Sequence, residues 1–504
     1  MAGGHFFLEL EPPEERLRDV PHVVIVGGGF AGIHACKALA KANVRITLID
    51  KRNFNLFQPL LYQVSTGLVS RGDIATPLRE LVGKQRNVQV LLGEVTNLYP
   101  EGKQIVFNGK TYSYDHLVLA TGSGSTFFGH DDWRTFAPPM KILEHAEEIR
   151  RRLLMAMEQA EQTPDPSARQ FLQTVVIVGA GPSGCEMAGA VSELMHWALN
   201  NAFKQLDPSK TRIVLVDPGD RVLRAMPAQQ SEAALASLER DGIEFIAQSR
   251  VQTMRPGEVI IGTPDGDRRI QAATVIWTAG VRPSHLGSKL SEATGCALDK
   301  SGRVVVEHDF SIPEHPEIRV AGDLSNYSHT SNGKPMPGMA APAKQAGTFI
   351  GKDIAAIVAN RSRPTFNYFD FGSMAVLDRA DISPFFLPHW KAGGETSCSV
   401  RMLSMRPTAM RDIEVGMIIF QAWLSSFTSG SLKTGRSPFT GAMSFTVGVG
   451  SPTLRNRACS SRRQRRMQES LIFDMKLADP RWGCRFQVAF GPPLSVYRFF
   501  GFPF

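Results

Sequence analysis

The amino-acid sequence predicts an α/β fold in which one unit of strand, turn, helix and strand occurs twice. The two copies span residues 23–50 and 174–217, and each ends on an aspartate. Short β-branched runs alternate with helical patterns around both copies, as in doubly wound parallel sheets. This alternation stops near residue 381. We therefore expect two Rossmann-like domains followed by an irregular C-terminal tail.

The first copy begins with the β-branched run 23–26 and continues into a glycine turn. Gly27, Gly29 and Gly32 give the spacing G-x-G-x-x-G, a helical pattern follows, and the next strand ends on Asp50. Such glycines make a tight turn that lets the backbone approach a pyrophosphate, and an acid further along holds a ribose hydroxyl. This copy therefore predicts a dinucleotide-binding site.

The second copy repeats these features after the strand 174–178. Its turn contains three glycines at the same spacing: Gly179, Gly181 and Gly184. The following strand ends on Asp217, whose charge would repel a 2′-phosphate and so favours NADH over NADPH. Arg221 and Arg224 lie close in sequence and leave NADPH open. Two complete fingerprints in one chain predict two nucleotides bound face to face.

Three further strands end in residues of the kind that surround a bound nucleotide. One runs into Thr121 and Gly122, a second into Gly280 and a third into Asp323. A carboxylate at Asp323 can accept a hydrogen bond from a ribityl hydroxyl, whereas the alternative is a turn aspartate that caps a helix. We expect these exits to lie beside the cofactors.

The small-residue segment 337–342 is expected to lead into a helix, with Pro342 in the first helical turn. Its N-terminus near Ala340 carries partial positive charge, which would stabilise negative charge on a flavin ring. The alternative is a surface helix with a favourable N-terminus. The apolar and aromatic block 53–64 has two equal interpretations, as packing beneath the first domain or as a lining near the flavin.

Composition bounds the class of protein. The chain has 504 residues, enough for two or three domains, and no run of 18 apolar residues, so we expect no transmembrane helix. The acidic N-terminus lacks the apolar core of a secretory signal. Six cysteines without C-x-x-C spacing fit a reducing compartment and argue against disulfides or a zinc site. No specific nucleic-acid partner is expected.

Seven motifs resemble those of type II NADH dehydrogenases, the single-subunit NADH:quinone oxidoreductases of bacteria. The similarity covers about residues 21–381, and the motifs are VVIVGGGFAG, NFNLFQPLLYQVSTG, LVLATGS, VVIVGAGPSGCEMAGAVSEL, VIWTAGVRP, RVAGD and GMAAPAKQAG. Many flavin disulfide reductases and ferredoxin reductases share the two fingerprints. The LFQPLLYQV block and the order of GPSGCE and AAPAKQ are more particular to the NADH–quinone group.

The resemblance implies FAD on the first fingerprint with Asp50 and Asp323, and NADH on the second with Asp217. It also implies that Glu186 lies near the nicotinamide and the flavin. The segment from Ala340 to Gln345 matches the family's quinone-proximal Ala-Gln-x-Ala-x-Gln element, except that residue 341 is Ala instead of Gln. Cys36 and Cys185, which have no partner at reactive spacing, are interpreted as packing residues.

The predicted domains follow from this resemblance. Residues 21–150 form the first part of an FAD domain, 171–295 an inserted NADH domain, and 300–381 the second part of the FAD domain with the quinone-proximal helix. Residues 382–504 form an atypical tail. The tail has 16 Lys and Arg against 6 Asp and Glu, a balance of +10, and the total of +8 leaves −2 for residues 1–381.

Three interpretations of this tail stay open. A change of reading frame after codon 381 is favoured, because Arg, Ser and Pro are in excess and no helical period is sustained. The second is a disordered basic tail whose segment 455–466 contacts anionic lipid or nucleic acid. The third is a genuine additional domain. The apolar stretch 415–424 is too short to predict an anchor.

The predicted function is transfer of a hydride from NADH to FAD and of two electrons to a membrane quinone, without proton pumping. One alternative is an NAD(P)H-dependent reductase of a small redox protein, and another is an inactive product with a disrupted C-terminus. The expected location is peripheral, on the cytoplasmic side of the bacterial inner membrane, or the cytoplasm if the tail does not anchor. A homodimer is one alternative for the oligomeric state.

Overall fold

The computed structural model describes residues 19–199 and 202–370, and then the shorter stretches 373–377, 382–385, 443–449, 471–477, 484–488 and 499–503. Contacts group the chain into two compact units. Unit 1 comprises residues 1–179 and 250–370, and unit 2 comprises residues 180–249 and 371–504. Each is described by itself. The predicted domain boundaries at 150, 171, 295 and 300 remain predictions.

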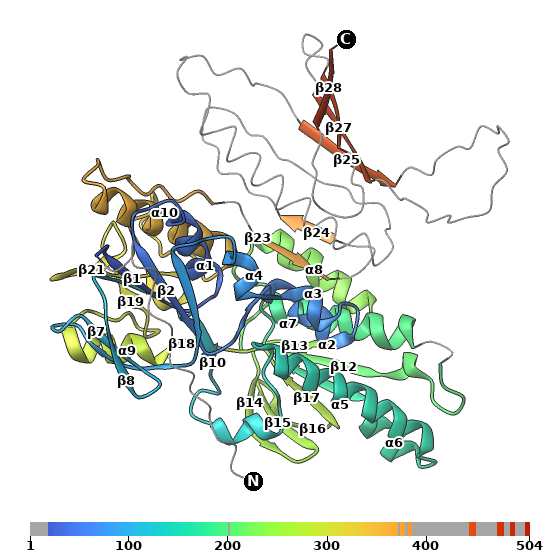
Figure 1. Ribbon diagram of the computed structural model, residues 1–504. Helices are drawn as coiled ribbons and strands as arrows, with labels where there is room; N and C mark the ends of the chain where they lie inside the picture. The colour runs from blue at the N-terminus through green and yellow to red at the C-terminus, as the bar shows by residue number, and fades with distance from the viewer. Residues whose placement is uncertain are drawn as a thin grey trace, which may run out of the picture. The chain divides into compact units, whose positions relative to one another are not determined.

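A six-stranded sheet forms the centre of unit 1 (Figure 1). Its order is β20 (Ser311–Ile312), β21 (His315–Val320), β9 (His116–Leu119), β1 (His22–Val26), β2 (Arg45–Asp50) and β5 (Val88–Leu92). Four of its pairings are parallel, and only β20 runs antiparallel to its neighbour. The parallel strands read as continuous apolar runs because both faces of such a sheet are covered. β1 is buried along its whole length.

Helices α1 (Phe30–Ala38) and α10 (Ala340–Val358) lie side by side in Figure 1. Their backbones approach closely, because a Cβ at Gly347 would lie 2.0 Å from the Ala31 carbonyl oxygen and one at Gly351 would lie 2.5 Å from that of Ala35. Neither contact leaves room for a side chain. Two glycines one turn apart on α10 therefore fix where this helix begins relative to the first glycine turn.

The remaining elements of unit 1 are short helices and antiparallel strands. The helices are α2 (Leu61–Thr66), α3 (Arg71–Ile74), α4 (Leu78–Val82) and α9 (His285–Thr294). One three-stranded sheet consists of β6 (Val95–Tyr99), β7 (Gln104–Phe107) and β8 (Lys110–Ser113), and another of β14 (Arg250–Arg255), β15 (Glu258–Thr263) and β16 (Gly266–Gln271). Two further sheets have two strands each. β3 (Phe54–Leu56) pairs with β4 (Ala75–Pro77), and β19 (Val304–Val305) pairs with β22 (Ser325–Asn326).

A two-stranded ribbon marks where the chain leaves and re-enters the sheet region of unit 1. β10 (Ser123–Ser125) follows β9, and β18 (Val281–Pro283) follows the exit at Gly280; the two pair antiparallel. Between them lie α5 (Leu143–Gln162), α6 (Pro166–Leu172), β11 (Thr174–Val178) and β17 (Thr274–Trp277), of which β11 and β17 pair in parallel. The insertion of an NADH domain between two parts of an FAD domain remains a prediction.

The sequence of residues 163–167, with two prolines, predicts a linker, but the second half of this prediction is wrong. Helix α6 begins at Pro166, and the Asp165 carboxylate caps it by accepting a hydrogen bond from the Ala168 amide at 2.8 Å. Proline at the first helical position and aspartate before it are both favourable helix starts. The Pro-Asp-Pro-Ser sequence was therefore a capping signal, and its proline content alone suggested a linker.

Unit 2 contains α7 (Pro182–Ser192), β12 (Arg212–Val216), α8 (Ala228–Arg240) and β13 (Ile243–Ile246), with β12 and β13 paired in parallel. β23 (Ser373–Val376) pairs with β24 (Ile382–Phe385). β23 leads into Leu377, whose carbonyl oxygen would lie 1.8 Å from a Cβ at Gly189 of α7. The end of the family-like sequence therefore packs directly on the helix of the second fingerprint.

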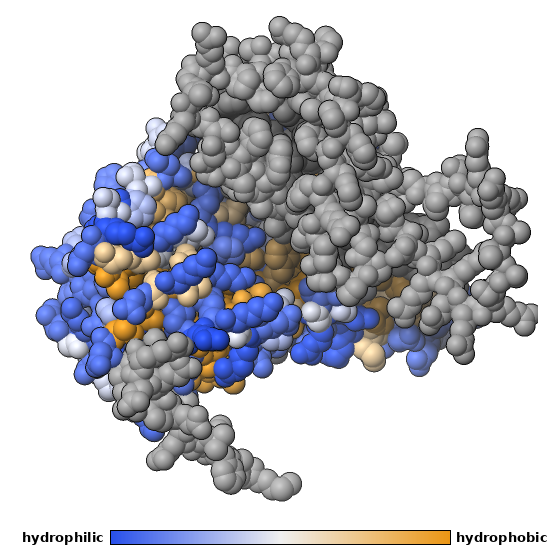
Figure 2. Space-filling view, turned by 45° about the horizontal axis from the view of Figure 1, so that its top comes forward, coloured by the Kyte–Doolittle hydropathy of each residue, from blue (hydrophilic) through white to orange (hydrophobic). Residues whose placement is uncertain are grey.

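The C-terminal stretches that the structure describes are paired strands. β25 (Met443–Val449) pairs with β26 (Leu471–Leu477), and β27 (Cys484–Val488) pairs with β28 (Phe499–Pro503), both antiparallel. The segments 415–424 and 455–466 lie outside the described residues. Among the helices that the structure does describe, none combines the length and the apolar character needed to span a bilayer. Hydrophilic side chains predominate between small apolar groups on the coloured surface in Figure 2.

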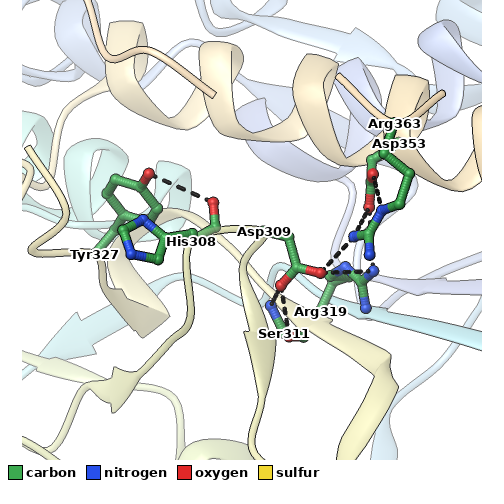
Figure 3. Close-up of polar contacts among 7 residues, drawn as sticks. All are labelled: His308, Asp309, Ser311, Arg319, Tyr327, Asp353 and Arg363. Carbon is green, nitrogen blue, oxygen red and sulfur yellow. Dashed lines mark hydrogen bonds and ion pairs between the residues drawn. The ribbon is translucent and has the colours of Figure 1, made fainter. Parts of the chain in front are cut away.

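Four charged residues in unit 1, of which two are buried, form an ionic cluster (Figure 3). Arg319 on β21 and Asp353 on α10 are 1% and 0% exposed, and one Arg319 nitrogen lies 3.1 Å from Asp353 Oδ2 and 3.2 Å from Asp309 Oδ2. Arg363 donates hydrogen bonds to both aspartates. Burial would raise the pKa of Asp309, but hydrogen bonds from Ser311 and then Arg363 keep it below its ordinary value, at about 2. The cluster ties α10 to the edge of the sheet.

Candidate functional site

Each glycine of the first turn meets a different steric requirement. Gly27 has φ +107°, and a Cβ there would lie 2.3 Å from the Ala120 carbonyl oxygen. A Cβ at Gly32 would lie 1.8 Å from the carbonyl oxygen of Gly27, so this glycine lets the helix pack against the turn. A Cβ at Gly29 would meet no atom of another part of the chain within 4 Å, which leaves space for a ligand at the start of α1. This is the arrangement that a bound pyrophosphate requires.

Asp50 lies at the end of β2, next to this turn. Its Oδ2 accepts a hydrogen bond from the Gly28 amide at 2.6 Å, and its Oδ1 accepts one from the Arg52 amide at 2.7 Å. Burial raises the pKa of Asp50, and these two backbone donors oppose that rise. Each oxygen keeps a further lone pair. The carboxylate is therefore oriented by the backbone and can still accept from a ribose hydroxyl.

The end of β9 carries a polar atom that has no partner within the described chain. Thr121 Oγ1 is buried and makes no hydrogen bond. The adjacent Gly122 has φ +65°, and a Cβ there would meet no atom within 4 Å. An orphaned hydroxyl beside an open glycine, at the same sheet edge as Gly29, fits a dinucleotide cofactor that supplies the missing partner.

Asp323 follows β21 at the same edge of the sheet. Its Oδ2 accepts a hydrogen bond from Ser123 Oγ at 2.6 Å and lies 3.5 Å from Lys141 Nζ. Parallel neighbours β9 and β21 bring Thr121 and Asp323 together, because the carboxyl ends of parallel strands share one edge. Sequence reasoning missed Ser123 and Lys141. A hydroxyl two residues after Thr121 was the available signal for Ser123.

The N-terminus of α10 begins at Ala340, as expected, and Ala341 and Pro342 lie in its first turn. Gln345 is half-buried, and its side-chain amide is already engaged with the backbone of Phe369, as donor at 2.9 Å and as acceptor at 3.0 Å. This contact was not predicted. The expected role of Gln345 toward a quinone therefore remains a prediction, and a quinone contact would use its remaining hydrogen or lone pair.

Residues of the block 53–64 take part in apolar packing and in a side-chain hydrogen bond. Leu60, Leu61 and Val64 belong to a small apolar core. Gln58 Nε2 donates a hydrogen bond to the Lys141 carbonyl oxygen at 2.8 Å. The packing interpretation is confirmed, and the position of this block beside a flavin ring stays a prediction.

The second turn is divided between the two units in sequence. In unit 1, Gly179 has φ +106°, and a Cβ there would lie 2.9 Å from the Ala279 amide nitrogen. Thr278 Oγ1 donates to the carbonyl oxygens of Val178 and Gly179. Gly280 has φ +76° and leads into β18. The strand exit at 277–280 thus supports the second turn as the exit at 120–122 supports the first.

In unit 2, Asp217 repeats the contacts of Asp50. Its Oδ2 accepts from the Ala180 amide at 2.8 Å, and its Oδ1 accepts from the Gly219 amide at 2.7 Å. A Cβ at Gly181 would meet no atom within 4 Å, so space for a ligand exists at the start of α7. Gly184 and Glu186 both lie on α7. The fingerprint geometry therefore occurs twice.

The described cysteines are free and buried: Cys36, Cys185 and Cys296. Burial raises the pKa of Cys36 to about 12 and raises that of Cys185 further. Thiols held neutral in this way are poor nucleophiles. Packing, as expected from the sequence, accounts for Cys36 and Cys185. In the part of the chain that the structure describes, no group of three metal-ligating side chains is placed to hold a metal.

Comparison with known proteins assigns the chain to a family. Residues 21–347 match the family described as pyridine nucleotide-disulphide oxidoreductase. The chain is 42% identical over 381 residues to the type II NADH:quinone oxidoreductase Ndh of Mycobacterium tuberculosis, which covers 73% of this chain and 81% of that protein. The chain belongs to the type II NADH:quinone oxidoreductase family. A Staphylococcus haemolyticus member is 27% identical over 368 residues, 72% of this chain and 89% of that protein.

Solved structures agree with this family in fold. The NDH2 structure from Plasmodium falciparum in complex with NADH matches 73% of this chain and 91% of its own, with a TM-score of 0.66 and 18% sequence identity. The sulfide:quinone oxidoreductase of Aquifex aeolicus matches at a TM-score of 0.56 with 19% identity. The predicted fold, with two dinucleotide-binding fingerprints, is confirmed. In this type II NADH:quinone oxidoreductase, both glycine turns fit the cofactors FAD and NADH.

Proposed function

We propose that this chain catalyses the oxidation of NADH with a membrane quinone as the acceptor, without pumping protons. The 42% identity to a type II NADH:quinone oxidoreductase, over 81% of that protein, carries this conclusion. FAD, when bound, accepts a hydride from NADH and passes two electrons to the quinone. The chain itself binds, orients and separates these partners.

The proposed FAD-binding residues lie at one edge of the sheet in unit 1. Gly27, Gly29 and Gly32 admit the pyrophosphate, and Asp50 accepts from a ribose hydroxyl. Thr121, Gly122, Asp323 and the start of α10 at Ala340 complete this set. The support is the space beside Gly29 and Gly122 and the orphaned Thr121 hydroxyl.

The proposed NADH-binding residues are the second set of glycines, Gly179, Gly181 and Gly184, together with Asp217 and Gly280. Asp217 supports NADH because its carboxylate is fixed by two amides at the position where a 2′-phosphate would be repelled. Glu186, the fifth residue of α7, is proposed to lie near the nicotinamide, and Gln345 near the quinone. A peripheral location on the cytoplasmic side of the membrane and a homodimer belong to this proposal.

An anaerobic flavin spectrum of the purified protein tests this function. NADH is expected to bleach the flavin absorbance near 450 nm, and a soluble quinone analogue is expected to restore it (about 1 mol of each per mol of flavin). Bleaching without recovery would contradict quinone as the acceptor and favour a small redox protein. A protein without flavin would contradict the proposed enzyme altogether.

A further inference from the structure

Lys141 lies where three separate parts of unit 1 meet. The segment before it pairs with the end of β17, since the Met140 amide donates to the Trp277 carbonyl oxygen at 2.9 Å and the Trp277 amide donates to the Pro138 carbonyl oxygen at 3.1 Å. Gln58 holds the Lys141 carbonyl oxygen through its side-chain amide at 2.8 Å. The backbone at Lys141 is therefore held in place by contacts that do not involve the Lys141 side chain.

The side chain of Lys141 reaches the carboxylate of Asp323. Nζ lies 3.5 Å from Oδ2, and the two side chains are only 15% and 25% exposed. Ser123 Oγ donates to the same oxygen at 2.6 Å. Both partners thus occupy Oδ2, while a Cβ at Gly338 would lie 3.2 Å from Oδ1. Glycine at 338 keeps the surroundings of Oδ1 open.

A carboxylate in this environment needs its counter-charge. Ion pairs on the surface contribute little because water screens them, but a largely buried charge without a partner is costly and tends to neutralise or to move. The ammonium group of Lys141 therefore supplies the counter-charge and holds the Asp323 carboxylate in one orientation. The Ser123 hydroxyl fixes that orientation but brings no charge. Of the two partners, only Lys141 supplies both effects.

We propose that Lys141 is a positioning residue that acts through Asp323. By pairing with Oδ2, it leaves Oδ1 free to accept a hydroxyl of the cofactor, and Gln58 acts one step further away by anchoring the Lys141 backbone. This inference deepens the proposed function and rests on it, since it concerns the FAD that the enzyme uses. It also gives the LFQPLLYQV block a role in cofactor retention.

The rate at which the holoenzyme releases FAD after dilution, measured by the rise in flavin fluorescence, tests the proposal. Lys141→Met is expected to accelerate release about tenfold or more, the effect of losing one charge-assisted contact. Lys141→Arg should restore at least part of the retention, because it returns the charge. Lys289→Met is the matched control: Lys289 also joins two elements, by donating to the Thr96 carbonyl oxygen at 2.7 Å, and it should leave release unchanged.

A double-mutant cycle separates positioning from general damage. Lys141→Met should add nothing to the release rate in an Asp323→Asn background, because its partner charge is already absent. Additive effects, or wild-type release in Lys141→Met, would overturn the proposal. If Lys141→Met gives no soluble holoenzyme, Gln58→Met takes its place, with a smaller acceleration that must also vanish in the Asp323→Asn background. If the wild-type holoenzyme retains FAD but does not reduce a quinone, the proposed function is contradicted instead.

Discussion

The side chain of Gln345 and the backbone of Phe369 exchange two hydrogen bonds, at 2.9 and 3.0 Å, across 24 residues of sequence. The amide of Gln345 mimics a neighbouring strand and holds the chain that leaves unit 1 against the first turns of α10. The position expected to face the quinone therefore also fixes the segment beside it.

Replacing Gln345 should separate the two half-reactions. In Gln345→Ala, both hydrogen bonds are lost, and kcat/KM for the quinone should fall about tenfold, as expected for roughly 1.4 kcal/mol of lost transition-state binding. Anaerobic reduction of the flavin by NADH should keep its rate. Gln162→Ala, which removes an exposed helical glutamine, is the control. An equal loss of rate in both half-reactions would mean that Gln345 contributes to the stability of the protein and not to quinone binding.

Asp217 should determine the choice of nicotinamide cofactor. In Asp217→Arg, the repulsion toward a 2′-phosphate becomes attraction, and the ratio of kcat/KM for NADPH to that for NADH should rise at least about tenfold. Asp207→Asn is a matched control, since Asp207 also accepts from the amide two residues on, at 3.0 Å, on the surface. An unchanged ratio would remove Asp217 from the ribose.

Gly347 should tolerate no side chain. Gly347→Ala places a methyl group 2.0 Å from the Ala31 carbonyl oxygen, so α10 must move away from α1. Such overpacking costs about 1–3 kcal/mol of unfolding free energy, and it should lower the FAD content of the purified protein. Gly72→Ala, whose nearest neighbour would be 3.8 Å away, should change neither quantity. Urea unfolding and the ratio of absorbance at 450 and 280 nm provide the two measurements.

The ionic cluster predicts a large effect from removing one charge. Asp353→Ala leaves Arg319 buried with one carboxylate fewer, and it should destabilise the protein by about 3–5 kcal/mol. The double variant Arg319→Met and Asp353→Leu removes both charges and should be more stable than the single one. Urea unfolding distinguishes them. A double variant as unstable as the single one would show that the cluster stabilises through its geometry and not through charge balance.

His22 should make stability depend on pH. Burial lowers the pKa of His22 from 6.5 to about 4, and its ring contacts Ser113 and Thr47. Above pH 6.5 the folded and unfolded states are both neutral at this site. Between pH 6.5 and 4 the unfolded state binds a proton that the folded state does not, so stability falls as the pH falls, by about 1.4 kcal/mol per pH unit.

The variant His22→Gln isolates this contribution. Its unfolding free energy at pH 7 should be lower than that of the wild type, but its decline between pH 6.5 and 4.5 should be shallower by about one proton. The control variant is His130→Gln, because His130 is exposed and its ring stacks on Trp133. An identical slope in His22→Gln and the wild type would mean that other groups dominate the acid dependence.

Local chemistry explains why much of this fold was predictable. Gly27 and Gly179 need positive φ, and Asp50 and Asp217 need a strand end beside the turn, so each fingerprint is specified by one continuous segment, 23–50 or 174–217. The start of α10 was predictable for the same reason. α6 was missed because Asp165 and Pro166 start helices and also occur in linkers, and tertiary contacts were needed to distinguish them.

The remaining contacts join residues that no local pattern connects. Ser123 and Lys141 meet Asp323 only because β9 and β21 are neighbours, and Arg319 meets Asp353 only because α10 packs back on the sheet. A single sequence shows such residues as an ordinary serine, lysine or arginine. The bond from Gln345 to Phe369 belongs to the same class, since its acceptor is a backbone group with no signature in sequence.

The pairing of β9 with β21 has a consequence for biosynthesis. The bond between Ser123 and Asp323 spans 200 residues. At ribosomal rates of about 5–20 residues per second, β9 is made roughly 10–40 s before its partner strand. During that interval its outer edge is open to the wrong neighbour. The first glycine turn emerges early, but the Asp323 carboxylate, which is proposed to bind FAD, emerges late, so we expect capture of FAD to be a late event in folding.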